Sequence, residues 1–190
     1  MNYELIRKFL HIFASAKIAM LIHFNLIKIW QFAIIVLVIY AFYVLFINIR
    51  ISHLNYFFKK LNRDKDYVDF GLLSFFLGIL IVWLVFYDKP QIVSASIMIL
   101  SLGDSFATII GKEFGKIKHP FNKDKSIQGT IAGIIGGYIG ASFFVLPLYA
   151  FIASFFSMIF ESFFKKDYLG IVNDNLFVPL FAGIILNLLI

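Results

Sequence analysis

Long apolar runs separated by polar loops set the pattern of this chain. They cover residues 9–24, 30–49, 70–87, 91–111, 127–163 and 176–190. A helix that crosses the hydrocarbon core of a bilayer needs about 20 mostly apolar residues, and these runs reach or approach that length. The run 127–163 is too long for one helix, and Pro147 predicts a break within it. The pattern predicts an all-α, polytopic integral membrane bundle of about seven transmembrane helices, with six as the alternative count.

Basic residues collect in alternate loops. Fourteen of the 17 lysines and arginines lie before residue 9 or in the loops 50–69, 112–126 and 164–175. Cytoplasmic loops of membrane proteins carry such an excess of positive charge. We therefore expect a multi-pass protein of the cell membrane with a cytoplasmic N-terminus. Residues 1–190 form one predicted domain, and the two loops 50–69 and 112–126 are its only sizeable aqueous parts.

Composition agrees with this class. The chain is 61% hydrophobic and has a mean hydropathy of +0.90, more apolar side chain than a soluble domain of 190 residues can bury. Its net charge of +6 fits an anionic partner at the membrane, and we expect no nucleic acid partner. The absence of cysteine excludes disulfides and thiolate metal sites.

Asp104 interrupts the run 91–111 about seven residues from its cytoplasmic end. At 1.5 Å per residue this places the carboxylate roughly 10 Å below the surface. An ionised group at that depth costs several kcal/mol unless it is paired or bound to a cation. One reading is a structural ion pair with a lysine of a neighbouring helix. The other is a catalytic carboxylate or divalent-metal ligand in a cavity that opens to the cytoplasm.

Glycines surround this aspartate and continue into the next loop. Gly103, Gly111 and Gly115 remove side chains near it, which permits either close helix packing or close approach of the backbone to a phosphate. Lys116 follows Gly115, but the spacing of the stretch is not that of a P-loop. We expect these glycines and Lys116 to contact a nucleotide by another design.

A predicted anion site follows at the start of the next helix. Ser126 suits the N-cap, Gly129 falls in the first turn, and Lys125 adds a full positive charge. Free N–H groups and the positive end of the helix dipole attract phosphate there. Glycines recur beyond Gly129 every four residues, a pattern typical of helix packing, and these faces could also serve an oligomer.

The last helix begins in the same way. Asp174 and Asn175 precede an apolar run on the cytoplasmic side, and Glu161 ends the preceding helix at the same level. Mg²⁺ prefers oxygen ligands from one or two carboxylates together with substrate phosphates. We expect Asp104 and Asp174 to bind Mg²⁺ or another divalent cation, and Glu161 and Asn175 to lie in the binding site.

Arg7, Lys8 and His11 share one face of the first helix. Snorkelling interface residues would give the same pattern, but these three gather on the membrane side that carries the acidic residues. The convergence suits a nucleoside triphosphate with Mg²⁺ that meets a lipid. Arg7, Lys8 and Lys125 are candidates to hold its phosphates, and either Asp174 or His11 could act as the general base.

Five motifs in this order resemble the membrane lipid-alcohol kinase family of dolichol kinase, phytol kinase and yeast-type diacylglycerol kinase. They are R-K-x-x-H at 7–11, G-D-x-x-A at 103–107, G-x-x-x-G-K at 111–116, K-S-x-x-G at 125–129 and D-N-L-x-V-P-L at 174–180. The resemblance spans nearly the whole chain. It implies transfer of a phosphoryl group, usually from CTP, to the hydroxyl of a membrane lipid with the help of a divalent cation.

Two alternatives stay open. The CTP-dependent phosphatidate cytidylyltransferases look similar around the aspartate, glycine and Lys-Ser motifs, and E-S-x-x-K-K at 161–166 is similar to one of their elements. Their glycine-rich stretch and paired acidic residues before the last helix are missing here, where the sequence is Asn-Asp-Asn at 173–175. An ion-coupled transporter would place its polar groups near the midplane of the membrane, and would often show an internal repeat.

Overall fold

The computed structural model describes residues 3–48, 71–164 and 174–190. Within them lie seven α-helices and no strand: α1 (Tyr3–His23), α2 (Ile29–Asn48), α4 (Gly71–Val85), α5 (Pro90–Phe114), α6 (Ile127–Ala141), α7 (Pro147–Ser162) and α8 (Asp174–Leu189). The all-α prediction and the count of seven are confirmed for this part of the chain. The predicted loop 50–69 and most of 164–175 lie outside the described residues.

The predicted break at Pro147 is also confirmed. Helix α6 ends at Ala141, and α7 begins at Pro147, where the missing N–H of proline leaves no helical hydrogen bond unmade. Because of this turn, α6 and α7 pack against each other as an antiparallel pair.

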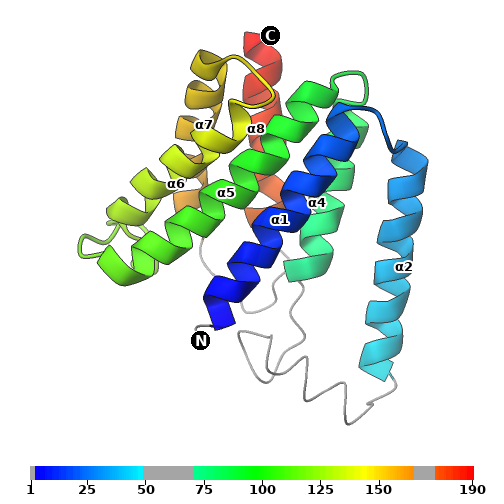
Figure 1. Ribbon diagram of the computed structural model, residues 1–190. Coiled ribbons are helices and arrows are strands. Elements are labelled where there is room, and N and C mark those ends of the chain that lie inside the picture. Colours follow the sequence, from blue (N-terminus) through cyan, green and yellow to red (C-terminus); the bar gives the residue numbers. More distant parts are fainter. Residues whose placement is uncertain (1–2, 49–70, 165–173) are drawn as a thin grey trace.

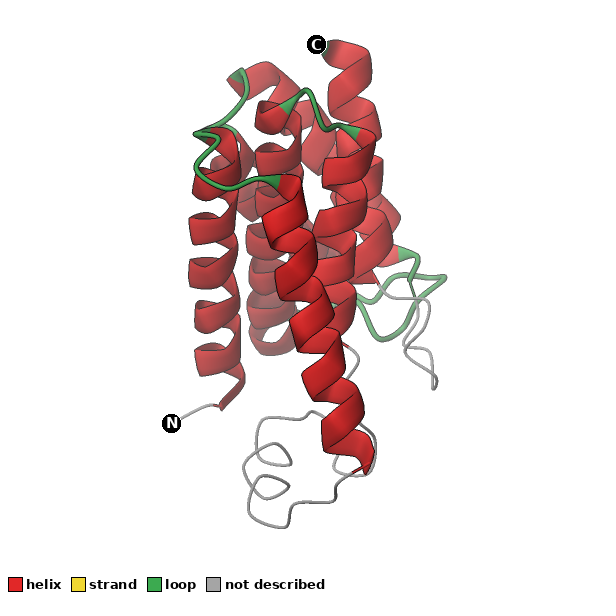
Figure 2. Cartoon of the chain, turned by 90° about the vertical axis from the view of Figure 1, so that its right-hand side faces the viewer, coloured by secondary structure: helices red, strands yellow, loops and turns green. Residues whose placement is uncertain are grey.

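Helix α5 is the centre of the bundle (Figure 1). It packs against α1 on one side and α6 on the other, and it also contacts α7 and α8. Helix α8 packs between α4 and α7, and α2 packs on the outside against α4. The helices run side by side along one direction, with the two chain ends at opposite ends of the bundle (Figure 2). Successive helices run in opposite directions. One end of the bundle therefore holds the start of α1, the end of α5, the start of α6, the end of α7 and the start of α8.

Helix length alone does not establish the predicted membrane class. Among the described residues, only α5, with 25 residues, is long and apolar enough to cross a bilayer. Five further apolar helices are shorter, and a helix of 15 or 16 residues, such as α6 or α7, is roughly 23 Å long. A bilayer core is about 30 Å thick, so these helices fall short of it by length.

The glycines of α6 bring it close to α5 and α7. A side chain at Gly136 would meet the carbonyl oxygen of Leu102 at 2.8 Å and the Phe106 ring at 2.9 Å. Gly133 and Gly137 face Met158 and Ser154 of α7 in the same way. The packing role predicted for these glycines is confirmed. Helices α5 and α7 of the same chain cover these glycine faces. An oligomer that packs through them stays a prediction.

We expect Gly136→Val to lower the stability of the purified protein by about 1–3 kcal/mol, because the added methyl groups must displace the α5 backbone or the Phe106 ring. Thermal unfolding measures the effect. Ile135→Phe is the control, since it adds bulk on the same helix at a side chain that is 51% exposed. Equal stability of the Gly136 and Ile135 variants would contradict close packing at Gly136.

Candidate active site

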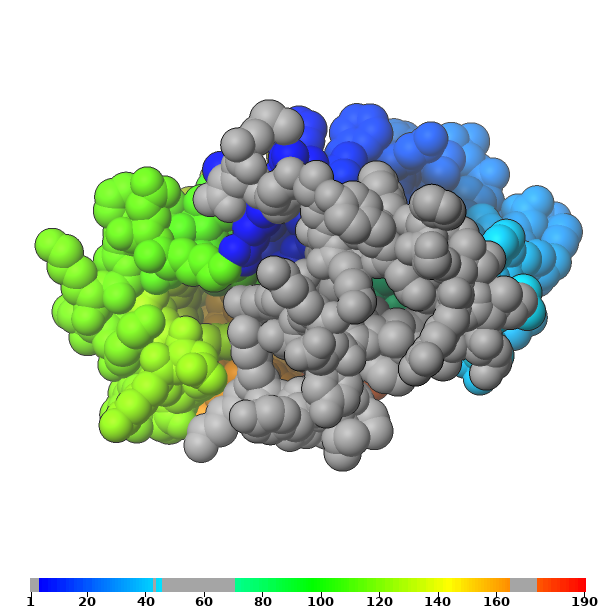
Figure 3. Space-filling model, turned by 90° about the horizontal axis from the view of Figure 1, so that it is seen from below, coloured from blue at the N-terminus to red at the C-terminus, as the bar shows by residue number. Residues whose placement is uncertain are grey.

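Three carboxylates from three helices meet at the end of the bundle that holds the start of α1. Asp104 lies on α5, Glu161 ends α7 and Asp174 begins α8, and one oxygen of each lies within 4.8 Å of the others. Figure 3 views this end, where α1 and the α5–α6 corner reach the surface side by side. Glu161 is only 4% exposed. The structure therefore unites the three acidic residues that the sequence placed at one level.

Two lysines compensate these acids. Lys8, which is 6% exposed, forms an ion pair with Asp104. Lys125 pairs with Glu161 and lies 3.8 Å from Asp174. Burial alone would lower the pKa of Lys125, but the Glu161 and Asp174 carboxylates outweigh it and raise that pKa above its usual value. Lys125 therefore stays protonated at neutral pH.

The pair between Lys8 and Asp104 is the structural ion pair that the sequence left open as one reading of Asp104. The Lys8 ammonium thus has a carboxylate partner in the structure, and its role in holding a phosphate stays a prediction. This ion pair does not neutralise all the negative charge of the site. Three carboxylates face two lysines, which leaves one formal negative charge in excess.

Two neighbours of Asp104 complete its surroundings. The Thr108 hydroxyl, one helical turn further along α5, donates to an Asp104 oxygen over 3.1 Å. On α1, the His11 ring lies 4.5 Å from the Phe75 ring, and its buried Nε2 has no hydrogen-bond partner within the described residues. His11 thus places a buried ring nitrogen, Nε2, beside the acidic cluster, and this atom is available to accept or donate a hydrogen bond. Thr108 was missed from the sequence, although its i, i+4 spacing from Asp104 was a usable signal.

Ser126 caps α6 as the sequence predicts. Its hydroxyl accepts a hydrogen bond of 3.2 Å from the Gly129 N–H, in the first turn. This bond, and a second from the Ile127 N–H to the Ile117 carbonyl, use two donors that were expected to be free for an anion. The predicted anion site at this helix start would therefore rest mainly on Lys125 and the helix dipole.

The loop between α5 and α6 is held in place by hydrogen bonds. Lys118 and Ser126 form an isolated antiparallel bridge, and the His119 ring lies 2.8 Å from the Thr130 hydroxyl. Burial and the nearby Lys125 charge lower the pKa of His119, which keeps this ring neutral at pH 7. Asn122 is 2% exposed and reaches the end of α7. Neither His119 nor Asn122 was singled out from the sequence, because their partners lie on other elements.

The glycines near Asp104 are used for packing. A side chain at Gly103 would meet the Met158 sulfur at 2.5 Å, and one at Gly111 would meet the Ser126 hydroxyl at 3.1 Å. Gly115 also faces Ser126, and a side chain at Gly129 would meet the Ala107 carbonyl at 2.8 Å. These glycines let α6 start beside the end of α5. Their direct approach to a phosphate stays a prediction.

Three further predicted residues make contacts outside the cluster or lie exposed. Arg7 lies 3.9 Å from Glu4 on its own helix, and Lys116 is exposed on the loop after α5. The Asn175 amide donates to the Gly71 carbonyl over 3.2 Å, so it ties the start of α8 to the start of α4. The structure thus gives Asn175 a packing contact, and its predicted role in binding a nucleotide stays untested.

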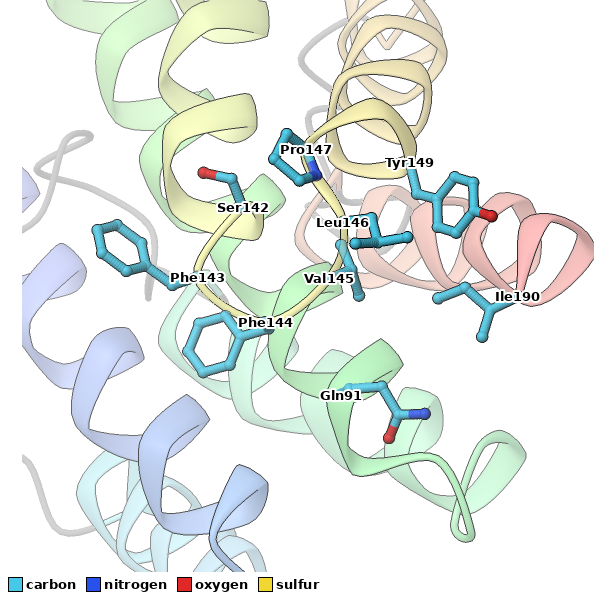
Figure 4. Close-up of a pocket in the computed structure, with 9 residues that line it drawn as sticks. All are labelled: Gln91, Ser142, Phe143, Phe144, Val145, Leu146, Pro147, Tyr149 and Ile190. Carbon is cyan, nitrogen blue, oxygen red and sulfur yellow. The ribbon is translucent and has the colours of Figure 1, made fainter.

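A cavity lies away from the acidic cluster (Figure 4). It measures about 520 Å³ and lies at the opposite end of the bundle, between the α6–α7 turn and the end of α8. Its lining residues are Gln91, Ser142, Phe143, Phe144, Val145, Leu146, Pro147, Tyr149 and Ile190. None of these nine side chains carries a charge, so this cavity has neither a carboxylate for a metal ion nor a lysine or arginine for a phosphate.

The donor set of the acidic cluster fits a hard divalent cation. All three ligand groups are carboxylates, their oxygens are close enough to share one ion, and their charge exceeds that of the two lysines. Mg²⁺ is bound by one or two carboxylates plus phosphate oxygens in enzymes that handle nucleotides. Fold and site together define an all-helical protein with a buried cluster of acidic and basic groups at one end.

Comparisons with known proteins connect this class to named relatives. A probable phytol kinase of Triticum aestivum, described as chloroplastic, is 42% identical over 69 residues, which are 36% of this chain and 23% of the relative. A probable phytol kinase of Glycine max is 31% identical over 133 residues, 63% of this chain and 45% of the relative. A farnesol kinase of Arabidopsis thaliana is 32% identical over 85 residues, 44% of this chain and 28% of the relative.

The chain is thus related to the phytol and farnesol kinases, and the resemblance indicated by its motifs is confirmed. The aligned part spans less than half the length of each of these three relatives. No protein-family model matches the chain, and no solved structure matches it.

Proposed function

We propose that this chain is a lipid-alcohol kinase that transfers the terminal phosphate of a nucleoside triphosphate, CTP, to the hydroxyl of a membrane lipid. The single observation that carries the proposal is the cluster of Asp104, Glu161 and Asp174 with Lys8 and Lys125 at one end of the bundle. Such a cluster can hold a metal–triphosphate complex, and the relatives named as phytol and farnesol kinases support this reaction. The acceptor we propose is an isoprenoid alcohol such as phytol, farnesol or a polyprenol.

Phosphoryl transfer depends mostly on positioning and on neutralising charge. In this site Asp104 and Asp174 would hold Mg²⁺, and Glu161 is a third carboxylate in reach of the same ion. The ion would supply charge neutralisation on the phosphate oxygens. Lys125 exchanges its Glu161 and Asp174 partners for phosphate oxygens, and the dipole of α6 favours the same anion. His11 Nε2 or an Asp174 oxygen accepts the proton of the lipid hydroxyl.

A membrane location for this reaction is part of the proposal. Large apolar side chains are exposed all around the bundle, among them Phe9 at 71%, Phe42 at 70% and Phe143 at 76%. A water-soluble monomer rarely exposes so many large apolar side chains, and a lipid-facing bundle would. We place the acidic cluster at the cytoplasmic face of the cell membrane, because the basic start of α1 and the lysine-rich loop between α5 and α6 lie at that end.

The experiment that tests the function uses the purified protein with CTP labelled at the γ-phosphate. Acceptors are phytol, farnesol, a polyprenol, diacylglycerol and phosphatidate. Label on the lipid supports the kinase, whereas label released as pyrophosphate with phosphatidate would identify a cytidylyltransferase. Absence of both products with every acceptor would overturn the proposal.

Divalent cations should stabilise the protein even without a nucleotide. We expect millimolar Mg²⁺ to raise the melting temperature by several degrees, since a ligand at 100 times its Kd contributes about 2.7 kcal/mol. Asp174→Asn should lose this shift, because one carboxylate of the cluster is removed. Asp88→Asn, an exposed aspartate between α4 and α5, should keep it. A shift of equal size in the Asp174 variant, at matched ionic strength, would argue against this ion site.

A further inference from the structure

Asn122 is a buried polar residue in a loop that is otherwise open to solvent. Among residues 116–125, which include four lysines, it is the one buried side chain, with 2% of its surface exposed. An amide is seldom buried so completely unless all its hydrogen bonds are made.

All polar atoms of the Asn122 side chain are used. Its Nδ2 donates to the carbonyl oxygens of Ser162 over 3.0 Å and Phe164 over 2.8 Å. Its Oδ1 accepts from the backbone N–H of Asp124 over 3.2 Å. The last carbonyls of a helix have no donor within the helix, so Asn122 caps the end of α7 from another part of the chain.

The same helix end carries the acidic partner of the phosphate-binding lysine. Three residues after Asn122, the Lys125 ammonium donates to the Glu161 carbonyl over 2.7 Å and pairs with the Glu161 carboxylate. The ring of Phe121 also stacks on that of Phe163, with centroids 4.3 Å apart. The loop segment before Lys125 and the residues after Glu161 are therefore held together by contacts between the loop and the end of α7.

We propose that Asn122 is a positioning residue that clamps the α5–α6 loop to the end of α7 and thereby sets Lys125 against the acidic cluster. The clamp acts through Lys125 and touches neither nucleotide nor lipid. Without it, Lys125 keeps its charge but loses its fixed place beside Glu161, Asp174 and the start of α6. The proposal rests on the proposed function for its effect on activity, and on the hydrogen bonds alone for its effect on the loop.

The first test is amide hydrogen exchange, which needs no activity. In Asn122→Ala the amides of His119 and Lys125, which are bonded within the loop, should exchange about tenfold faster or more, while those of α1 and α5 stay unchanged. Asn122→Asp, of the same shape, should act like alanine, because it sets a carboxylate against two carbonyl oxygens. Asn187→Ala is the control: that asparagine accepts a hydrogen bond from Lys89 at the opposite end of the bundle. Unchanged exchange in both Asn122 variants would overturn the clamp.

The second test separates positioning from general stability. Asn122→Ala should lower kcat/KM for the nucleotide about tenfold in the wild-type background and less than about twofold in a Lys125→Met background, because the clamp acts through that lysine. Independent losses that add across the two backgrounds would overturn the positioning role. If the wild-type protein transfers no phosphate, the proposed function fails, and the exchange experiment still decides the clamp.

Discussion

Asp104→Asn should lower the rate of phosphate transfer to the lipid by at least about 10²–10³-fold, the loss expected when a charge that stabilises the transition state is removed. The change keeps the shape of the side chain and its contact with Thr108. It also leaves two carboxylates facing two lysines, so the cluster becomes electrically balanced and the protein should stay folded. Transfer of γ-labelled phosphate measures the rate, and thermal unfolding checks the fold.

The matched control for this prediction is Asp88→Asn, which removes the same charge at an exposed position outside the cluster. It should leave transfer unchanged. A folded Asp104→Asn protein with near-normal activity would show that Asp104 serves only its ion pair with Lys8. In that case the metal role assigned to this carboxylate would have to be abandoned.

Lys125→Met should be both much less active and less stable than the wild-type protein. Without the ammonium, three carboxylates within 4.8 Å share Lys8 as their compensating lysine, and loss of one partner of a buried ion pair costs about 3–5 kcal/mol. We expect the melting temperature to fall by about 10 °C. We expect kcat/KM for the nucleotide to fall by about 10²-fold or more, because a charge-assisted contact to phosphate is lost.

Excess Mg²⁺ separates the two effects of this substitution. The cation should restore much of the stability of Lys125→Met, because it neutralises the three carboxylates, but it should not restore transfer. Lys123→Met, an exposed lysine on the same loop, should change neither quantity. If the Lys125 variant were as active as the Lys123 variant, Lys125 would not be a phosphate ligand.

The helices could be predicted from the sequence because the signals that define them are local. Apolar runs of fixed length, a proline at the first position of α7 and a serine before α6 each act within one or two turns of helix. The alternation of helix direction then follows from counting, and it places Asp104, Lys125, Glu161 and Asp174 at one end. Helix ends depend on finer balances: α5 runs to Phe114, three residues beyond the predicted end at 111.

The partners of the charged side chains could not be predicted from the sequence. Lys8 and Asp104 are 96 residues apart, and nothing local indicates that this lysine pairs with the aspartate while Arg7 lies near Glu4. The crossing of α1 over α5 decides it. The same holds for the glycines near Asp104: the sequence allowed either close helix packing or the approach of a phosphate, and the structure shows that they make room for the start of α6.

The sequence by itself thus determined the helices, their alternating direction and the end at which charged groups gather, because these depend on hydrophobic length and on nearby residues. Only the tertiary structure decided that Glu161 completes a cluster of three carboxylates, that two lysines compensate it, and that Asn122 holds the loop of Lys125 against α7. These features depend on how helices distant in the chain pack at distances of a few ångströms, and small residues on α5 and α6 set that packing.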